Sequence, residues 1–217
     1  MKTIKVILFS LFLAGSLGII AAMFWEQELK FTKPTPRPLG FVATAKEGDV
    51  LSPTQFIAVA QGKPTMLHFF NSNCPCSRFN MQEVAYLVET YGSRVNFVAV
   101  LQDKDPKAAN DFLEKYNLKM STILDSAGVV SDYYGVYSTP QAVLLDVSEK
   151  IYYKGNYNKA RFCNSRKTAF ANLAINSLLA GQPLPKFVQQ ASVPYGCTLP
   201  SDVQQPPSFL SSLNIFN

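Results

Sequence analysis

Two cysteines one residue apart, Cys74 and Cys76, stand between an apolar segment and a segment with helical spacing. A cysteine at the N-terminus of a helix lies at the positive end of the helix dipole, which lowers the pKa of its thiol. The thiolate is the form that attacks disulfides and binds soft metal ions. These residues therefore predict a redox site in which Cys74 is the nucleophile and Cys76 resolves the mixed disulfide. A structural thiol pair or a metal clip is the non-redox alternative.

The single histidine, His68, lies six residues before Cys74 and alternates with apolar neighbours. A lone histidine on such a segment is more often a hydrogen-bonded core residue than a catalyst. The functional alternative is that His68 relays protons to the thiols, because histidine titrates near neutral pH.

The other two cysteines, Cys163 and Cys197, lie toward the C-terminus. Four cysteines allow three pairings. With Cys74 and Cys76 close in sequence, we expect a structural disulfide between Cys163 and Cys197 that ties the C-terminal tail to the start of the last helix. A second redox pair that passes electrons to Cys74 and Cys76 is the alternative.

The N-terminus carries a predicted membrane anchor over residues 1–25. Val6 to Trp25 is a stretch of 20 residues without a charge, preceded by Lys2 and Lys5. About 20 apolar residues suffice to cross a bilayer, whereas a cleavable signal has an apolar region of about 7–15 residues. Ala21-Ala22 is only a weak cleavage site, so we expect an uncleaved, single-pass anchor with a cytoplasmic N-terminus.

This orientation predicts an inner (cytoplasmic) membrane protein whose residues 26–217 lie on the periplasmic side, where disulfides persist. Residues 26–40 contain alternating prolines and form a predicted extended spacer. The net charge is +5, of which +3 falls before residue 38. Since the chain has no basic run or basic aromatic face, we expect no nucleic-acid partner.

Hydrophobic periodicity predicts strands that alternate with helices between residues 41 and 181. Short β-prone runs predict strands at 65–70, 95–101, 121–124, 141–146 and 150–154. Helical spacing predicts helices from the Cys74 segment to about 91, from 106 onward, at 129–134 and at about 165–179. The alternation implies an α/β fold, and the final hairpin implies a mixed sheet. The tail, 182–217, is expected to be irregular and tied to the domain.

In this order, the segments resemble the thioredoxin-like superfamily, and most of all its membrane-anchored TlpA/ResA-like branch, over roughly residues 51–179. Met66 to Cys74 is similar to the strand that leads into the redox cysteine of that family. Thr139-Pro140 is similar to the family's Thr-Pro, in which the proline is cis and packs beside that cysteine. The resemblance implies a thioredoxin-like mixed sheet flanked by helices, with Thr139 and Pro140 as site residues.

The chain also departs from the family pattern. The family motif is Cys-x-x-Cys, whereas this chain has Ser77 at the second cysteine position and Cys76 one residue earlier. Asn73 replaces the tryptophan that often precedes the first cysteine, and His68 replaces a buried acid. These changes bear on the redox potential and on the direction of the reaction.

Three functions from different classes are compatible with this sequence. The leading one is a membrane-tethered thiol–disulfide oxidoreductase without a cofactor, which acts on cysteines of exported proteins through Cys74 and Cys76 and takes electrons from a membrane donor. The second is a thioredoxin-like metallochaperone for Cu(I), with His68 as a third ligand beside the two thiolates. The third is a redox-silent binding module that uses the groove beside Pro140.

Overall fold

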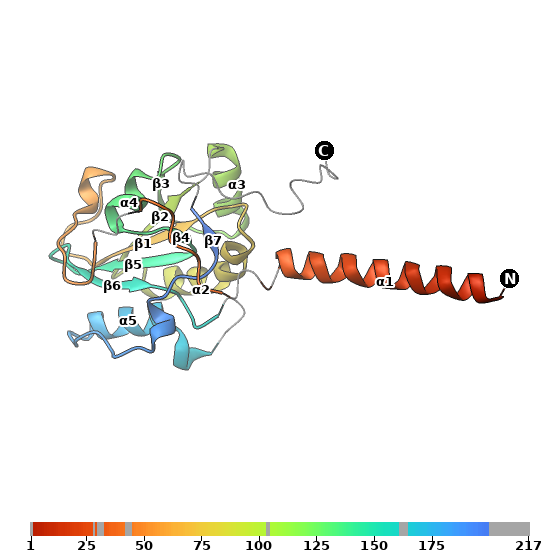
Figure 1. The fold of residues 1–217 in the computed structure, drawn as a ribbon. Helices are drawn as coiled ribbons and strands as arrows, with labels where there is room; N and C mark the ends of the chain where they lie inside the picture. Colours follow the sequence, from red (N-terminus) through yellow and green to blue (C-terminus); the bar gives the residue numbers. More distant parts are fainter. Residues whose placement is uncertain are drawn as a thin grey trace.

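A central sheet of five strands organises the domain in the computed structural model, which describes residues 2–27, 29, 33–41, 45–102, 105–160 and 165–199. The sheet order is β3-β2-β1-β5-β6 (Figure 1). The strands are β1 (Thr65–Phe70), β2 (Asn96–Leu101), β3 (Ser121–Leu124), β5 (Gln141–Leu145) and β6 (Ile151–Gly155). β1 pairs in parallel with β2 and β2 with β3, whereas β1–β5 and β5–β6 are antiparallel. The predicted mixed sheet is thereby confirmed.

Helices cover both faces of this sheet. Alternate residues of a strand point to opposite faces, so Met66 and Phe70 of β1 pack in one core cluster while Leu67 and Phe69 pack in another. The first cluster includes side chains of α2 (Pro75–Tyr91), α3 (Pro106–Lys115) and α5 (Phe170–Leu179). The second includes side chains of α4 (Val129–Tyr134) and of the segment 45–59. All six residues of β1 are buried, as expected for the middle strand of a covered sheet.

Local signals fix where the helices begin and end. Pro75 is the first residue of α2, where its missing N–H group costs nothing, and Gly92 follows the last turn. The carboxylate of Asp105 accepts a hydrogen bond from the Lys107 backbone at 2.9 Å and caps α3. One prediction is wrong in detail. The last helix begins at Phe170, because the non-helical ψ of 72° at Ala169 separates it from a short 3-10 turn, η3 (Arg166–Thr168).

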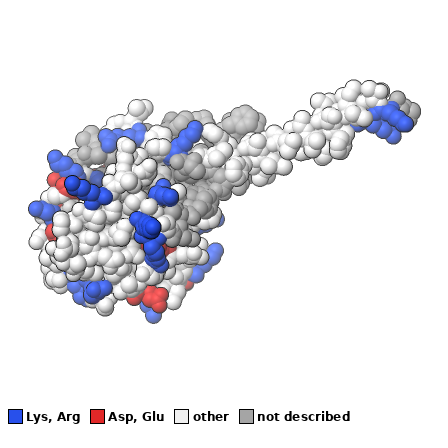
Figure 2. All heavy atoms as spheres, turned by 90° about the horizontal axis from the view of Figure 1, so that it is seen from below, with Lys and Arg blue, Asp and Glu red and all other residues white. Residues whose placement is uncertain are grey.

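The N-terminal helix α1 (Lys2–Gln27) extends away from the domain (Figure 1). Its residues Lys2–Trp25 are long and apolar enough to cross a membrane, and none of this span is buried in the protein. On the face of α1 seen in Figure 2, basic atoms lie at the N-terminal tip and the length of the helix beyond it is uncharged up to the grey residues. On the domain face in the same view, basic and acidic groups are interspersed. The length and composition fit the predicted anchor.

The described part of the tail, residues 182–199, is more ordered than its composition predicts, and residues 200–217 lie outside the described residues. It contains a 3-10 turn, η4 (Gln189–Ala191), and a two-residue strand, β7 (Cys197–Thr198). β7 pairs antiparallel with β4 (Ser138–Thr139) in a small second sheet (Figure 1). The spacer joins this structure through a bridge between Pro34 and Tyr195. These partners lie far apart in sequence, which is why local composition does not reveal the pairing.

Candidate redox site

The site begins at the N-terminus of α2, directly after the central strand. Cys74 is the N-cap residue of α2, and its backbone N–H donates to the Asn71 carbonyl at 3.1 Å. The Asn71 side chain fixes this loop, because its oxygen accepts from the Asn73 N–H at 2.8 Å. Cys74 is only 3% exposed. The positive end of the α2 dipole therefore lies at a sulfur that is largely shielded from water.

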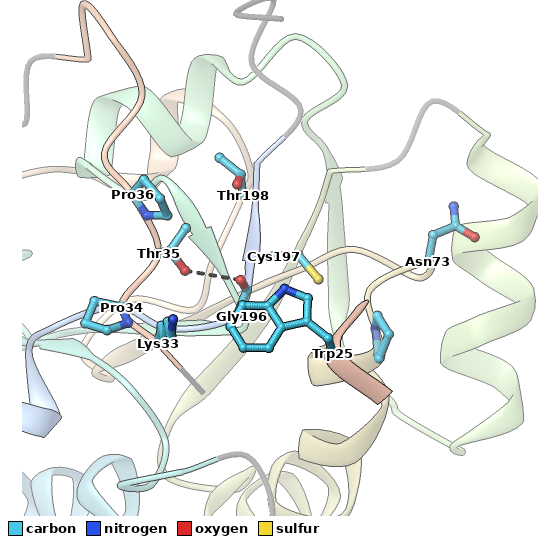
Figure 3. A pocket seen from close by; sticks show the side chains of 10 residues that line it. Trp25, Lys33, Pro34, Thr35, Pro36, Asn73, Gly196, Cys197 and Thr198 are labelled. Atoms are coloured by element: carbon cyan, nitrogen blue, oxygen red, sulfur yellow. Dashed lines mark hydrogen bonds between the residues drawn. The ribbon is translucent and has the colours of Figure 1, made fainter. Parts of the chain in front are cut away.

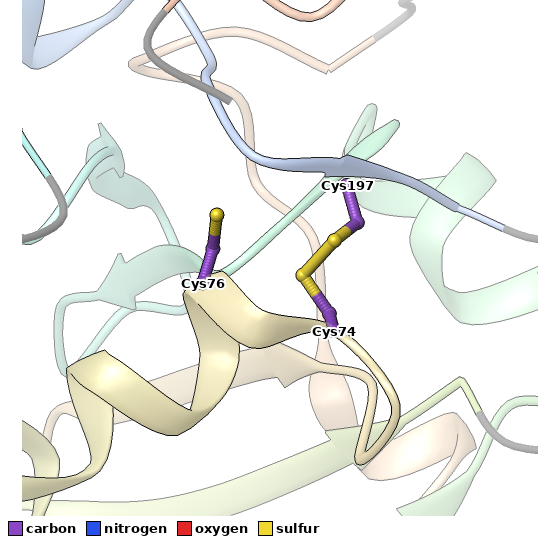
Figure 4. A group of neighbouring side chains, drawn as sticks. All are labelled: Cys74, Cys76 and Cys197. Carbon is purple, nitrogen blue, oxygen red and sulfur yellow. A yellow bond between two sulfur atoms is a disulfide. The ribbon is translucent and has the colours of Figure 1, made fainter. Parts of the chain in front are cut away.

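A disulfide joins Cys74 to Cys197, with an S–S distance of 2.06 Å and a Cα–Cα distance of 6.0 Å (Figure 4). The expected bond between Cys163 and Cys197 is therefore wrong, and Cys163 lies outside the described residues. The oxidised partner of Cys74 is likewise Cys197 rather than Cys76. The physical reason is register: in the pairing of β4 with β7, Thr139 lies opposite Cys197, and the Thr139 carbonyl oxygen is 3.7 Å from the Cys74 sulfur.

The third sulfur belongs to Cys76, the second residue of α2, which is fully buried. The sulfur atoms of Cys74, Cys76 and Cys197 all lie within 4.8 Å of one another (Figure 4). A thiolate on Cys76 is thus close enough for exchange with the disulfide after small side-chain rotations. The site is a group of three sulfurs supplied by two segments, rather than the predicted pair.

The predicted site residues Thr139 and Pro140 follow one another at the edge of the site, where the Thr139 carbonyl oxygen faces the Cys74 sulfur. The Thr139–Pro140 peptide bond is cis, as the resemblance implies, and Thr139 belongs to β4, which pairs with the strand β7 that carries Cys197. Ser77, at the family's second cysteine position, is buried, and its hydroxyl oxygen accepts from the Asn71 N–H at 3.3 Å. Ser77 therefore supports the loop before Cys74.

Gly196 was not singled out by the sequence, yet it allows the tail to approach the site. A Cβ built on this residue would lie 2.1 Å from the carbonyl oxygen of Thr139, and its φ of +128° is rare for any residue with a side chain. The Thr35 hydroxyl donates to the Gly196 carbonyl at 3.2 Å (Figure 3) and lies 2.8 Å from the Ser138 hydroxyl oxygen. The tail strand is thus held between the spacer and β4.

Changing Gly196 to alanine should weaken the Cys74–Cys197 bond, because the added methyl group collides with the Thr139 carbonyl. We expect the equilibrium constant for forming the disulfide to fall at least about tenfold, which raises the reduction potential by about 30 mV. Thiol trapping in glutathione buffers of graded potential measures this shift. Gly40→Ala is the matched control, since Gly40 also has a positive φ but no atom near its Cβ position. Equal shifts in both variants would contradict the close-approach argument.

His68 lies in the core on β1, stacked on Phe70 and edge-on to Tyr157. Its Nδ1 is 2.7 Å from the Tyr157 hydroxyl oxygen, and its Nε2 has no hydrogen-bond partner among the described residues. Complete burial lowers the pKa of His68 to about 3. A ring that stays neutral between pH 5 and 8 does not titrate during thiol exchange. This favours the core role of His68 over the proton relay.

The buried histidine should make the protein sensitive to acid. Its folded pKa, about 3, lies below the value of about 6.5 expected in the unfolded chain, so the unfolded state binds a proton that the folded state excludes. The stability of the wild type relative to His68→Gln should therefore fall by about 1.4 kcal/mol per pH unit as pH drops from about 6 to 4. Urea unfolding across this range measures the difference. If the free energy of unfolding changes with pH in the same way for both proteins, the burial of His68 has no such effect.

The pH profile of thiol exchange should also be the same for the wild type and His68→Gln.

A cavity of about 490 Å³ opens beside the disulfide (Figure 3). Its walls come from the end of α1, the spacer, the start of α2 and the tail, and its lining includes Trp25, Lys33, Asn73, Pro75 and Cys197. Cys197 is half-buried, whereas Cys74 is almost completely covered. A thiol that approaches through this cavity reaches the disulfide from the side of the membrane helix.

Residues 44–198 match the sequence profile of DUF6436, a domain of unknown function. The chain belongs to this family. The match takes in all three sulfurs of the site, from the loop before Cys74 to β7, so the tail strand is part of the DUF6436 domain rather than an appendage.

This DUF6436 protein is also similar to named redox proteins. It is 28% identical over 149 residues to the thiol-disulfide oxidoreductase ResA of Bacillus cereus, a match that covers 65% of this chain and 80% of ResA. It is 30% identical over 90 residues to the thioredoxin-like protein YneN of Bacillus subtilis, covering 40% of this chain and 52% of YneN. These relatives confirm the predicted ResA-like branch and the enzyme class, a thiol–disulfide oxidoreductase.

Two solved structures share the fold. A hypothetical protein from Sinorhizobium meliloti 1021 superposes with a TM-score of 0.59 at 18% identity, over 77% of this chain and 97% of that protein. An uncharacterized conserved protein from Geobacillus kaustophilus gives a TM-score of 0.59 at 20% identity, over 81% and 98%. At these identities the likeness concerns the fold alone. Together with the sheet order and the cis proline, it agrees with the predicted thioredoxin-like architecture.

Proposed function

We propose that this DUF6436 protein is a membrane-tethered thiol–disulfide oxidoreductase that acts on cysteines of exported proteins, with Cys74 as the reacting sulfur. The observation that carries the proposal is the disulfide between the N-cap residue of α2 and Cys197 on a strand paired with β4. This disulfide lies at a helix N-terminus, beside the Cys76 sulfur and a cavity, so another thiolate can approach and exchange with it. A disulfide with a purely structural role needs neither a third sulfur nor a cavity beside it.

The chemistry is a two-electron exchange. In the reducing direction, the Cys74 thiolate attacks a substrate disulfide, forms a mixed disulfide and expels one substrate thiolate. The Cys197 thiolate then attacks the Cys74 sulfur, the second substrate thiolate leaves, and the Cys74–Cys197 bond forms. The substrate gains two electrons and the enzyme loses them. The reverse sequence oxidises a substrate dithiol, and the direction depends on the potentials of the partners.

Cys76 adds a second route. Its thiolate can attack the Cys74 sulfur of the Cys74–Cys197 bond, so that a Cys74–Cys76 bond forms and Cys197 leaves as a thiolate. The number of disulfides is unchanged by this internal step, so no external oxidant is required. It would release the tail strand from Cys74 while the protein stays oxidised. In this scheme, Cys76 keeps the predicted resolving role, and Cys197 shares it.

The sequence of α1 supports a proposed location. The stretch from Val6 to Trp25 has no charged residue and follows Lys2 and Lys5, a pattern that favours insertion with the N-terminus in the cytoplasm. We therefore place the domain on the periplasmic side of the inner membrane, where exported cysteines are found and disulfides persist. A dithiol donor in the membrane would regenerate the reduced enzyme.

A redox titration of the full chain in detergent micelles tests the proposal. Thiols are trapped by alkylation at each potential, and the cysteine pairs are mapped by mass spectrometry. We expect Cys74 to pass between a reduced form and a disulfide with Cys197, with a Cys74–Cys76 species enriched in Gly196→Ala. If Cys74 neither forms a disulfide nor exchanges with an added peptide disulfide at any potential, the oxidoreductase proposal fails.

A further inference from the structure

We propose that Cys74, Cys76 and Cys197 bind one Cu(I) ion once the Cys74–Cys197 bond is reduced. The group of three is the only set of histidine, cysteine and carboxylate side chains close enough to share a metal ion among the described residues. His68 is not a member, so the third ligand is a sulfur from the tail rather than the imidazole. This binding activity goes beyond thiol exchange and does not depend on it.

The spacing of the sulfurs fits one ion. With metal–sulfur bonds of about 2.3 Å, three sulfurs around one metal lie about 4 Å apart. The three sulfur atoms here lie within 4.8 Å of one another (Figure 4). Once the bond between two of them is reduced, small rotations of the side chains bring all three to the required distances.

The third ligand stays at the site without the disulfide. β7 is held by its pairing with β4, and the Thr35 backbone N–H donates to the Pro194 carbonyl at 2.8 Å. The Thr35 hydroxyl also donates to Gly196, the residue before Cys197. These contacts do not involve sulfur, so reduction leaves Cys197 beside the other two cysteines.

The ligand set favours Cu(I). Soft thiolates select Cu(I) and Zn²⁺, but Zn²⁺ in structural sites takes four ligands. The described group offers three sulfurs and no histidine or carboxylate as a fourth ligand. Cys74 and Cys76 are 3% and 0% exposed, so water has little access to two of the three ligands. The positive end of α2 offsets the negative charge of a three-thiolate complex.

The site exists in only one redox state. Reduction by a dithiol transfers two electrons and two protons to the Cys74–Cys197 bond, and the dithiol becomes a disulfide. Copper remains Cu(I) when it binds, and each thiol that becomes a ligand releases its proton. When the disulfide re-forms, two of the three ligands are lost. Copper binding and the Cys74–Cys197 bond therefore exclude each other.

An anaerobic titration of the full chain in detergent tests the site. The protein is reduced with a phosphine, the phosphine is removed, and Cu(I) is added in competition with bathocuproine disulfonate. We expect one Cu(I) per reduced chain and an affinity at least about 100-fold lower for Cys197→Ser, because it lacks one of three ligands. Cys163→Ser is the matched control and should bind as the wild type does. The oxidised wild type should not compete with the chelator.

X-ray absorption separates loss of a ligand from loss of fold. We expect three sulfur neighbours around copper in the reduced wild type and two in Cys197→Ser. Gly196→Ala keeps every thiol but displaces Cys197, and its affinity should also fall. The proposal is overturned if Cys197→Ser binds copper as tightly as the wild type, or if the wild type shows only two sulfur neighbours. Either result leaves the thiol-exchange titration to be judged independently.

Discussion

Replacing Cys74 by serine is expected to lower the rate of thiol–disulfide exchange by at least about two orders of magnitude, because serine provides no thiolate for attack. Cys74 belongs to both the Cys74–Cys197 bond and the Cys74–Cys76 bond of the proposed scheme. No other cysteine can therefore take its place. The rate of reduction of a fluorescent peptide disulfide by the pre-reduced full chain measures the effect.

Single serine variants of the other cysteines show which of them resolves the mixed disulfide. With Cys76→Ser, a pre-reduced enzyme should still complete one turnover, because Cys197 resolves the mixed disulfide. With Cys197→Ser, turnover should depend on Cys76. Cys163→Ser should react at the wild-type rate. Wild-type turnover in Cys74→Ser would remove Cys74 from the mechanism, and an unchanged phenotype in Cys74→Ser/Cys76→Ser would favour the redox-silent binding module.

Replacing Cys197 by serine is expected to destabilise the oxidised protein by about 3–5 kcal/mol. The disulfide closes a loop with a sequence separation of 123 residues, and closing a long loop restricts the unfolded chain. For a domain of this size, the loss corresponds to a fall in melting temperature of about 10 °C or more. Urea unfolding of the oxidised full chain, monitored by circular dichroism, measures the change.

The same measurement decides between the two pairings of Cys197. If Cys197 is bonded to Cys74, then Cys74→Ser costs as much as Cys197→Ser, and the double variant costs no more than either. Cys163→Ser should then be nearly neutral. If Cys163 were the partner, its replacement would instead match the loss in Cys197→Ser, and Cys74→Ser would leave the stability unchanged.

The elements of the domain were largely predictable because their signals are local. β1 spans the expected residues 65–70, and β3 and α4 also have the expected bounds. A proline at the first helical position and a capping Asp105 are strong short-range signals, so α2 and α3 begin where expected. The last helix was predicted too long, since the break at Ala169 has no glycine or proline to mark it.

The site was predictable only in part. Cys74 and the cis Pro140 follow from a pattern that the sequence displays directly. The partner of Cys74 does not, because sequence alone cannot choose among the three pairings of four cysteines. Cys197 reaches the site through the pairing of two short strands that lie some 60 residues apart. The one local hint was Gly196, whose lack of a side chain permits that approach.

The position of Thr35 limits how far the reactive sulfurs can travel. Thr35, which is hydrogen-bonded to the tail strand that carries Cys197, lies only ten positions after Trp25, near the end of the membrane helix. A fully extended chain of that length spans at most about 35 Å. With α1 in a bilayer, the sulfurs remain in a thin layer above its surface. Partners that are themselves bound to the membrane would share this layer and meet the site at high local concentration, whereas soluble partners must first enter it.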